Sequence, residues 1–117
     1  MRGRVKTILL GVALGISACL MAAATPVVYA YASLPIEDGR GHDGSSPETA
    51  VVIEADYEQD AISTEYTWLY VHCLTCGLVS QSLQQTGGRT YDVMSMVRSN
   101  GEPYTVYFDI TRSFGNW

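Results

Sequence analysis

Hydrophobic and polar positions change their spacing along this chain and divide it into three parts. Residues 1–6 are basic, and the uncharged, mostly apolar run 7–32 follows them. Residues 33–49 show no apolar period, whereas from residue 50 onward apolar positions recur first at helical spacing and then at every second residue. The pattern predicts a signal peptide over 1–32, a flexible leader over 33–49 and one small α+β domain over 50–117.

A basic start followed by an apolar stretch is the layout of a secretory signal. Small residues at the −3 and −1 positions favour cleavage after Ala32, with cleavage after Ala24 as the alternative. The sequence ending in Cys19 resembles a lipobox, in which Cys19 would carry a lipid. The run 7–32 is also long enough to span a bilayer as an uncleaved anchor. Each interpretation predicts export, to the periplasm or the extracellular space.

The domain is expected to begin with a strand and a helix. Residues 50–55 are rich in β-branched side chains and predict the strand. Asp56, with Gln59 three residues later, has the form of a capping box that starts a helix, and Gly77 is expected to end it in a left-handed conformation. The predicted apolar face consists of Ile62, Tyr66, Leu69 and Cys73, beside Ala61 and Trp68.

After Gly77 the apolar period changes from 3.6 to 2. Three strands are predicted, over residues 78–84, 90–97 and 104–110. Glycines in 86–89 predict the first turn, and Asn100-Gly101 predicts a hairpin because both residues tolerate positive φ. One face of the last strand is expected to carry Tyr104, Val106, Phe108 and Ile110.

The order strand, helix, three strands predicts the α+β class. One helix packed on a four-stranded antiparallel sheet, in the cystatin-like order β-α-β-β-β, lets both layers bury an apolar face. The tyrosines Tyr91, Tyr104 and Tyr107, together with Phe108 and Trp68, are interpreted as sheet and core packing.

Charge is unevenly distributed. Three of the seven basic residues lie within the first six positions, and all twelve acidic residues lie at Glu37 or later. Beyond residue 32, four arginines stand against twelve carboxylates, a formal charge of −8. This field repels phosphate backbones and anionic membranes, so we expect no nucleic-acid partner. A cationic partner stays open, as does the simpler interpretation that the charge serves solubility. Membrane association is expected only through a retained N-terminal segment or a lipidated Cys19.

Cys73 and Cys76 form a Cys-x-x-Cys pair. Redox enzymes lower the thiol pKa at a helix N-terminus, whereas this pair follows a predicted helix C-terminus, where the dipole is reversed. In an exported protein a structural disulfide is therefore the first hypothesis. The alternatives are a redox-active pair, free thiols, and a metal site with His72 or His42 as a further ligand, although a closed zinc site needs four ligands.

The sequence offers no other catalytic arrangement. No serine lies in a Gly-x-Ser-x-Gly elbow, and the acidic residues from Glu54 to Asp60 are explained by a helix start and a solvated face. We expect no catalytic residues and no cofactor.

Several short segments resemble a group of small, uncharacterised exported bacterial proteins. They are Trp68-Leu69, the Gly-Arg-Thr-Tyr-Asp-Val stretch 88–93, the Val-Tyr-Phe-Asp-Ile stretch 106–110 and Phe114-Gly115. The resemblance covers about residues 47–115 and implies the fold and export, but no activity. In the group the helix-to-strand turn carries a Tyr-Pro-Gly-like sequence, so Cys73 and Cys76 here are an addition to the scaffold.

The predicted element order also resembles cystatin-type and PepSY-type modules, several of which bind or inhibit peptidases. This is a likeness of fold alone. The Gln-x-Val-x-Gly loop of cystatins is absent, since residues 81–85 lack both the valine and the glycine.

Together these features predict an exported, non-enzymatic module that binds a protein or peptide, with an exposed edge strand as the contact. The alternative is a thiol–disulfide redox or metal-binding protein that uses Cys73 and Cys76. Oligomeric state, and whether Trp117 docks on the domain, stay open.

Overall fold

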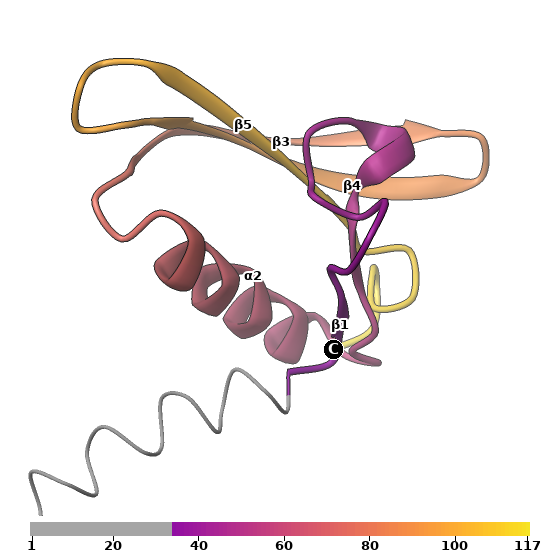
Figure 1. The fold of residues 1–117 in the computed structure, drawn as a ribbon. Helices are drawn as coiled ribbons and strands as arrows, with labels where there is room; N and C mark the ends of the chain where they lie inside the picture. The colour runs from indigo at the N-terminus through magenta and orange to yellow at the C-terminus, as the bar shows by residue number, and fades with distance from the viewer. Residues whose placement is uncertain (1–33) are drawn as a thin grey trace, which may run out of the picture. The chain divides into compact units, whose positions relative to one another are not determined.

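Five strands and one α-helix make up residues 34–117, the part of the chain that the computed structural model describes (Figure 1). In chain order the elements are β1 (Ile36–Glu37), the 3₁₀ helix η1 (Pro47–Thr49), β2 (Val51–Ile53), α2 (Glu58–His72), β3 (Gly77–Thr86), β4 (Arg89–Val97) and β5 (Pro103–Asp109). The α+β class is as expected. The predicted signal peptide, its cleavage sites after Ala24 and Ala32, and Cys19 lie outside the described residues.

The strands form one mixed sheet in the order β1-β2-β5-β4-β3. The hairpins β3–β4 and β4–β5 are antiparallel, as is β1–β2, but β2 runs parallel to β5. The expected four-stranded antiparallel sheet is therefore wrong in two respects. The sheet has a fifth strand, β1, and β2 is parallel to its neighbour because α2 carries the chain across one face of the sheet before the meander begins (Figure 1).

The segment expected to be a flexible leader instead contains β1 and η1. Ser46 caps η1 in a reciprocal capping box with Thr49, and the Gly44 carbonyl accepts a hydrogen bond of 2.8 Å from the Tyr107 amide of β5. Gly44 has a φ of 81°, and a Cβ there would lie 2.9 Å from Cγ1 of Val106. Glycine is thus required both by the backbone and by space, and it brings the segment against the sheet.

The two hairpin turns differ in geometry, and only the second differs from expectation. Between β3 and β4, Gly87 and Gly88 both have positive φ, 62° and 77°, which is the two-residue turn whose twist matches the strands. Between β4 and β5 positive φ occurs at Gly101 but not at Asn100. There the Arg98 amide donates to the Glu102 carbonyl, so the turn is one residue longer than expected.

The start of α2 differs from the predicted capping box. Tyr57 is the N-cap and makes no side-chain hydrogen bond to the helix. The carbonyl of Asn116 instead accepts the Glu58 amide at 2.7 Å, while Asp56 forms an ion pair of 2.6 Å with Arg112. The C-terminal segment caps this helix, an arrangement that local sequence does not contain.

The end of α2 also lies earlier than predicted. The helix ends at His72 with Cys73 as C-cap. Gly77 is the first residue of β3, and its φ is not positive. The disulfide-bonded turn between Cys73 and Cys76, and not a left-handed glycine, therefore separates helix from strand.

The buried face of α2 is offset from the predicted face. Ile62 and Tyr66 are each 46% exposed. The side chains that face the sheet are Ala61, Thr64, Glu65, Trp68 and Leu69. The prediction failed because two of these five are polar, and an apolar pattern cannot reveal a polar residue in the interface.

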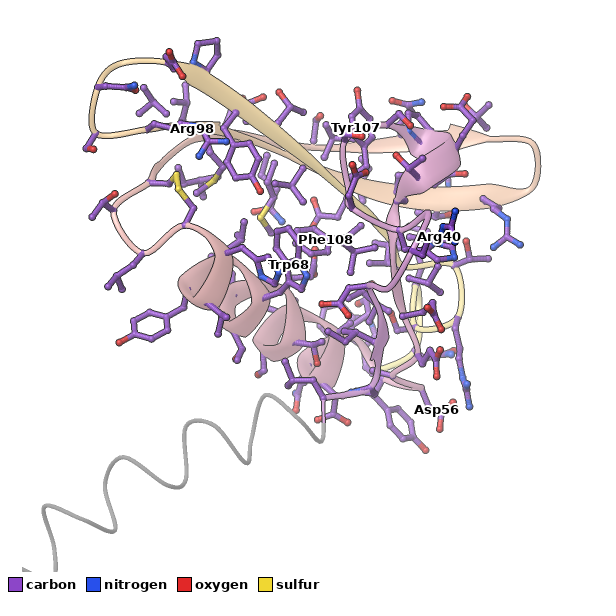
Figure 2. All side chains as sticks on the ribbon, in the orientation of Figure 1. Arg40, Asp56, Trp68, Arg98, Tyr107 and Phe108 are labelled. Carbon is purple, nitrogen blue, oxygen red and sulfur yellow. A yellow bond between two sulfur atoms is a disulfide. The ribbon has the colours of Figure 1, made fainter. Side chains whose placement is uncertain are left out.

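The core lies between α2 and the face of the sheet formed by alternate residues of β4 and β5. Trp68 meets Phe108 edge to face, with ring centroids 5.5 Å apart (Figure 2). On the last strand Val106, Phe108 and Ile110 are buried, as the alternation predicted, and Tyr104 is half-buried. Within residues 34–117, no helix has the length and apolar character needed to cross a membrane.

Candidate functional site

Two carboxyl side chains meet inside the helix–sheet interface. Glu65, from the middle of α2, is 1% exposed, and Asp92, from β4, is 4% exposed. Asp92 pairs in register with Phe108 of β5 on one side and Leu83 of β3 on the other, so its side chain shares the helix-facing side of the sheet with Phe108. The helix presents Glu65 to this side, and the two carboxyl groups share a hydrogen bond.

One of the two carboxyl groups holds a proton. Burial, followed by the hydrogen bond and the negative charge of Asp92, raises the pKa of Glu65 to about 10. At neutral pH Glu65 is therefore an acid that donates to the Asp92 carboxylate. Oδ2 of Asp92 also accepts a hydrogen bond of 2.6 Å from Nε2 of Gln81.

Two buried oxygen atoms of this pair have no other partner within the described part of the chain: Glu65 Oε2 and Asp92 Oδ1. A single proton held between the two carboxyl groups makes one of them a hydrogen-bond donor and the other its acceptor. No other residue in the described part of the chain donates a hydrogen bond to these two oxygen atoms. The pair therefore has unused capacity to accept hydrogen bonds or to neutralise a positive charge.

The pair lies at a cavity of about 380 Å³ between the first half of α2, the hairpin β3–β4 and the segment after β5. Its walls are mainly apolar, from Ile62, Leu83, Ile110, Phe114 and Trp117. This volume falls within the range of small-ligand pockets, about 300–1,000 Å³. An apolar pocket with a few convergent polar groups is the usual form of a binding site.

All titratable residues in the pocket lining are acidic. They are Glu58, Glu65 and Asp92, and the described lining includes no lysine, arginine or histidine. Oε1 of Glu58 accepts a hydrogen bond of 3.2 Å from the Gly115 amide. The electrostatic character of the pocket is thus negative, which favours a cationic or hydrogen-bond-donating group over an anion.

The segment after β5 completes the pocket wall. Besides the backbone bond to Glu58, Nδ2 of Asn116 donates to the carbonyls of Asp56 and Arg112, at 3.2 and 3.1 Å. The backbone of this segment is therefore docked on the start of α2. The side chain of Trp117 lines the pocket while remaining 80% exposed.

The Cys-x-x-Cys pair lies elsewhere. Cys73 and Cys76 are joined by a disulfide, with Cα atoms 5.3 Å apart, in the turn after the C-terminal end of α2. His72 stacks on Trp68, with ring centroids 3.8 Å apart, and Nδ1 of His42 lies 3.0 Å from the Ala50 carbonyl. Among residues 34–117 no group of three or more His, Cys, Asp or Glu side chains could hold a metal ion.

Sequence reasoning missed Glu65 and Asp92, although both had a signal. Glu65 lies four residues after Ala61 and three before Trp68, so a helix places it between two apolar residues of one face. In the alternating strand, Asp92 has the same parity as Met94 and Met96, which are buried. The signal for the pair was one carboxyl residue at an inward position of the helix and another at an inward position of the strand.

Comparison with protein-family models, curated proteins and solved structures finds no match to this chain. The resemblance to small exported bacterial proteins stays a prediction.

Proposed function

We propose that this protein is an exported, non-enzymatic module that binds an extended, basic peptide segment of a partner protein, which is added to the sheet as a strand beside β3. Support comes from the two edges of the sheet, from the charge of the chain and from the disulfide. Each bears on a different part of the proposal.

The observation that carries the proposal is the form of the β3 edge. β3 is ten residues long and its outer side has no neighbouring strand among the described residues. It has no charged residue and no proline, and nine of its ten residues are exposed, including Leu78, Val79 and Leu83. Soluble proteins normally protect an edge of this length with charges, proline, a bulge or a cover, and of these devices the described part of the chain gives β3 only the register shift near its start.

The opposite edge of the sheet is different. β1 has two residues, one of which is Glu37, and a strand so short offers little to an added chain. In β3 the register shifts between Leu78 and Ser80, as at a bulge, so the regular part available for pairing is 80–86. The regular edge of the sheet is thus confined to one strand.

Charge favours a basic peptide over a second copy of this chain. Residues 33–117 carry a formal charge of −8, so two copies placed edge to edge repel one another. α2, the layer next to β3 on one face, contains Glu58, Asp60 and Glu65 and no lysine or arginine. A basic peptide approaching β3 is attracted by the same field.

Export is proposed on two grounds. The basic and then apolar start of the chain has the layout of a secretory signal. Disulfides such as Cys73–Cys76 persist mainly in oxidising compartments.

The test is amide hydrogen exchange with an extended basic peptide of alternating lysine and valine. Binding beside β3 slows exchange in 80–86 and leaves β1 unchanged. The matched control peptide carries N-methyl groups on alternate residues, which removes the donors that a strand edge needs. Equal binding of the methylated peptide, or protection confined to other elements, would contradict the proposal.

The alternative function is thiol–disulfide exchange by Cys73 and Cys76, favoured by their presence as a disulfide in an accessible turn. The position after a helix C-terminus opposes it, because the dipole there destabilises a thiolate. The reduction potential of the Cys73–Cys76 disulfide distinguishes the two functions. A structural disulfide is expected to have a reduction potential below about −300 mV, and a catalytic disulfide a higher one.

A further inference from the structure

We propose that the pocket beside β3 receives a basic side chain of the bound peptide, and that Glu65 and Asp92 together neutralise its charge. The inference rests on the proposed function, since the side chain belongs to the peptide that pairs with β3. It adds a specificity that strand pairing alone does not provide.

The pocket opens at the edge strand. Gln81, Ser82 and Leu83 of β3 contribute to its lining, and Leu83 is the register partner of Asp92. A peptide residue opposite Leu83 would point its side chain to the same helix-facing side, because paired residues share a face. The peptide backbone would then lie two strand spacings, about 10 Å, from the backbone of Asp92. A long basic side chain spans this separation, and a short one leaves the pocket empty.

The carboxyl pair is suited to a cation. Asp92 is buried without a basic partner among the residues described, and Glu65 Oε2 and Asp92 Oδ1 lack partners beyond the pair. A buried charge is costly until it is paired and hydrogen-bonded. An ammonium or guanidinium group brings several donors and a positive charge to atoms that need both.

The apolar walls suit the rest of a basic side chain. Lysine and arginine carry a methylene stem that packs on apolar surface while the charged group reaches a polar one. Ile62 and Phe114 line the pocket and are each partly exposed, at 46% and 39%, so they are available for this contact. An anionic or wholly apolar side chain would leave the carboxyl pair repelled or unsatisfied.

The experiment is calorimetric titration of the protein with four extended peptides that differ at one central residue: lysine, norleucine, arginine or citrulline. Citrulline preserves the length of arginine and removes its charge, and norleucine keeps the four-carbon stem of lysine and removes its ammonium group. A charge-assisted hydrogen bond contributes about 1.5–3 kcal/mol, so we expect each charged peptide to bind at least about tenfold more tightly than its neutral counterpart.

Protein variants locate the effect. Asp92→Asn is expected to abolish the preference for the charged peptide, whereas Asp60→Asn, an equal change of charge on α2 outside the pocket, is expected to preserve it. Where Asp92→Asn does not fold, Ile62→Trp serves instead, because it fills the pocket from a half-exposed position. That variant should bind the lysine and norleucine peptides equally.

The outcomes separate the two proposals. Protection of β3 with equal affinity for charged and neutral peptides would overturn the pocket assignment and leave strand addition standing. A charge preference that survives both Asp92→Asn and Ile62→Trp would also overturn it. Binding of n-butylamine or butylguanidinium as tight as that of the peptides would show a site for free amines, which contradicts a peptide side chain as the occupant. A charge preference without β3 protection would contradict strand addition and, with it, this inference.

Discussion

Glu65 of α2 and Asp92 of β4 share a hydrogen bond across the helix–sheet interface, with Glu65 protonated and both side chains almost wholly buried. A pair of facing apolar residues would serve stability better, because a buried carboxyl pair must retain a proton or find a cation. The pair also lies at the one site where the pocket, the edge strand and the C-terminal segment come together in the described structure. We propose that its presence there serves binding.

The first prediction concerns pH. In the unfolded chain Glu65 ionises near the ordinary glutamate pKa of 4.5, and in the folded protein its pKa is about 10. Between these values the folded state holds the additional proton, so stability is lost as pH rises. At somewhat over 1 kcal/mol per pH unit, the loss attributable to Glu65 between pH 5 and pH 7.5 is about 3 kcal/mol. Urea unfolding of wild type and Glu65→Gln at several pH values measures it.

Glu65→Gln should remove this slope and be increasingly more stable than wild type as pH rises. Asp60→Asn, on the exposed side of the same helix, is the control and should retain the slope. A difference between wild type and Glu65→Gln that is constant from pH 5 to pH 8 would contradict a retained proton.

The second prediction concerns Gly44. Alanine there meets both a positive φ and the side chain of Val106, so Gly44→Ala should destabilise the protein by about 2–4 kcal/mol. Gly41 has a similar φ of 86° and nothing within 4 Å, so Gly41→Ala should cost about 1 kcal/mol. If Gly44→Ala and Gly41→Ala unfold at equal denaturant concentrations, residues near 44 do not pack on β5.

The third prediction concerns the disulfide. The loop from Cys73 to Cys76 is short, so the Cys73→Ser, Cys76→Ser variant should lose about 2 kcal/mol of stability. Peptide binding should be unchanged, because neither cysteine lines the pocket. Loss of binding in the folded double variant, measured with the lysine peptide, would favour the thiol hypothesis instead.

The fourth prediction concerns the cap of α2. Asn116→Ala removes the side-chain hydrogen bonds to the carbonyls of Asp56 and Arg112 and should cost about 1 kcal/mol. The segment that Asn116 holds contacts Glu58 and carries Trp117. Because both of these residues line the pocket, the variant should also weaken peptide binding. Arg112→Ala loses an exposed ion pair and should change stability less, since such pairs contribute about 0–1 kcal/mol. The reverse order in thermal unfolding would show that the ion pair, and not Asn116, secures the segment.

Local sequence was sufficient for the positions of the three hairpin strands and for most of the buried face of the last strand. Alternation located β3, β4 and β5 to within two residues, because side chains of a strand alternate between faces whatever the strand packs against. The same was true of the Cys73–Cys76 disulfide, because two cysteines three positions apart can pair without help from distant residues.

Local sequence was insufficient where the partner of a group lies far along the chain. Asp56 could cap the helix, yet it pairs with Arg112, while the Asn116 carbonyl satisfies the Glu58 amide. The parallel β2–β5 pair and the addition of β1 to the sheet likewise depend on contacts between distant segments.

The sequence by itself determined the α+β class, the meander and the excess of acidic residues, because each follows from periodicity or composition. Only the tertiary structure decided which face of α2 is buried, and therefore that Glu65 meets Asp92. A helix with polar residues on its inner face and apolar residues on its outer face gives only a weak periodic signal to orient it. Asp92 lies 27 positions after Glu65 and on another element. The two carboxyl groups become neighbours only when the helix packs on the sheet.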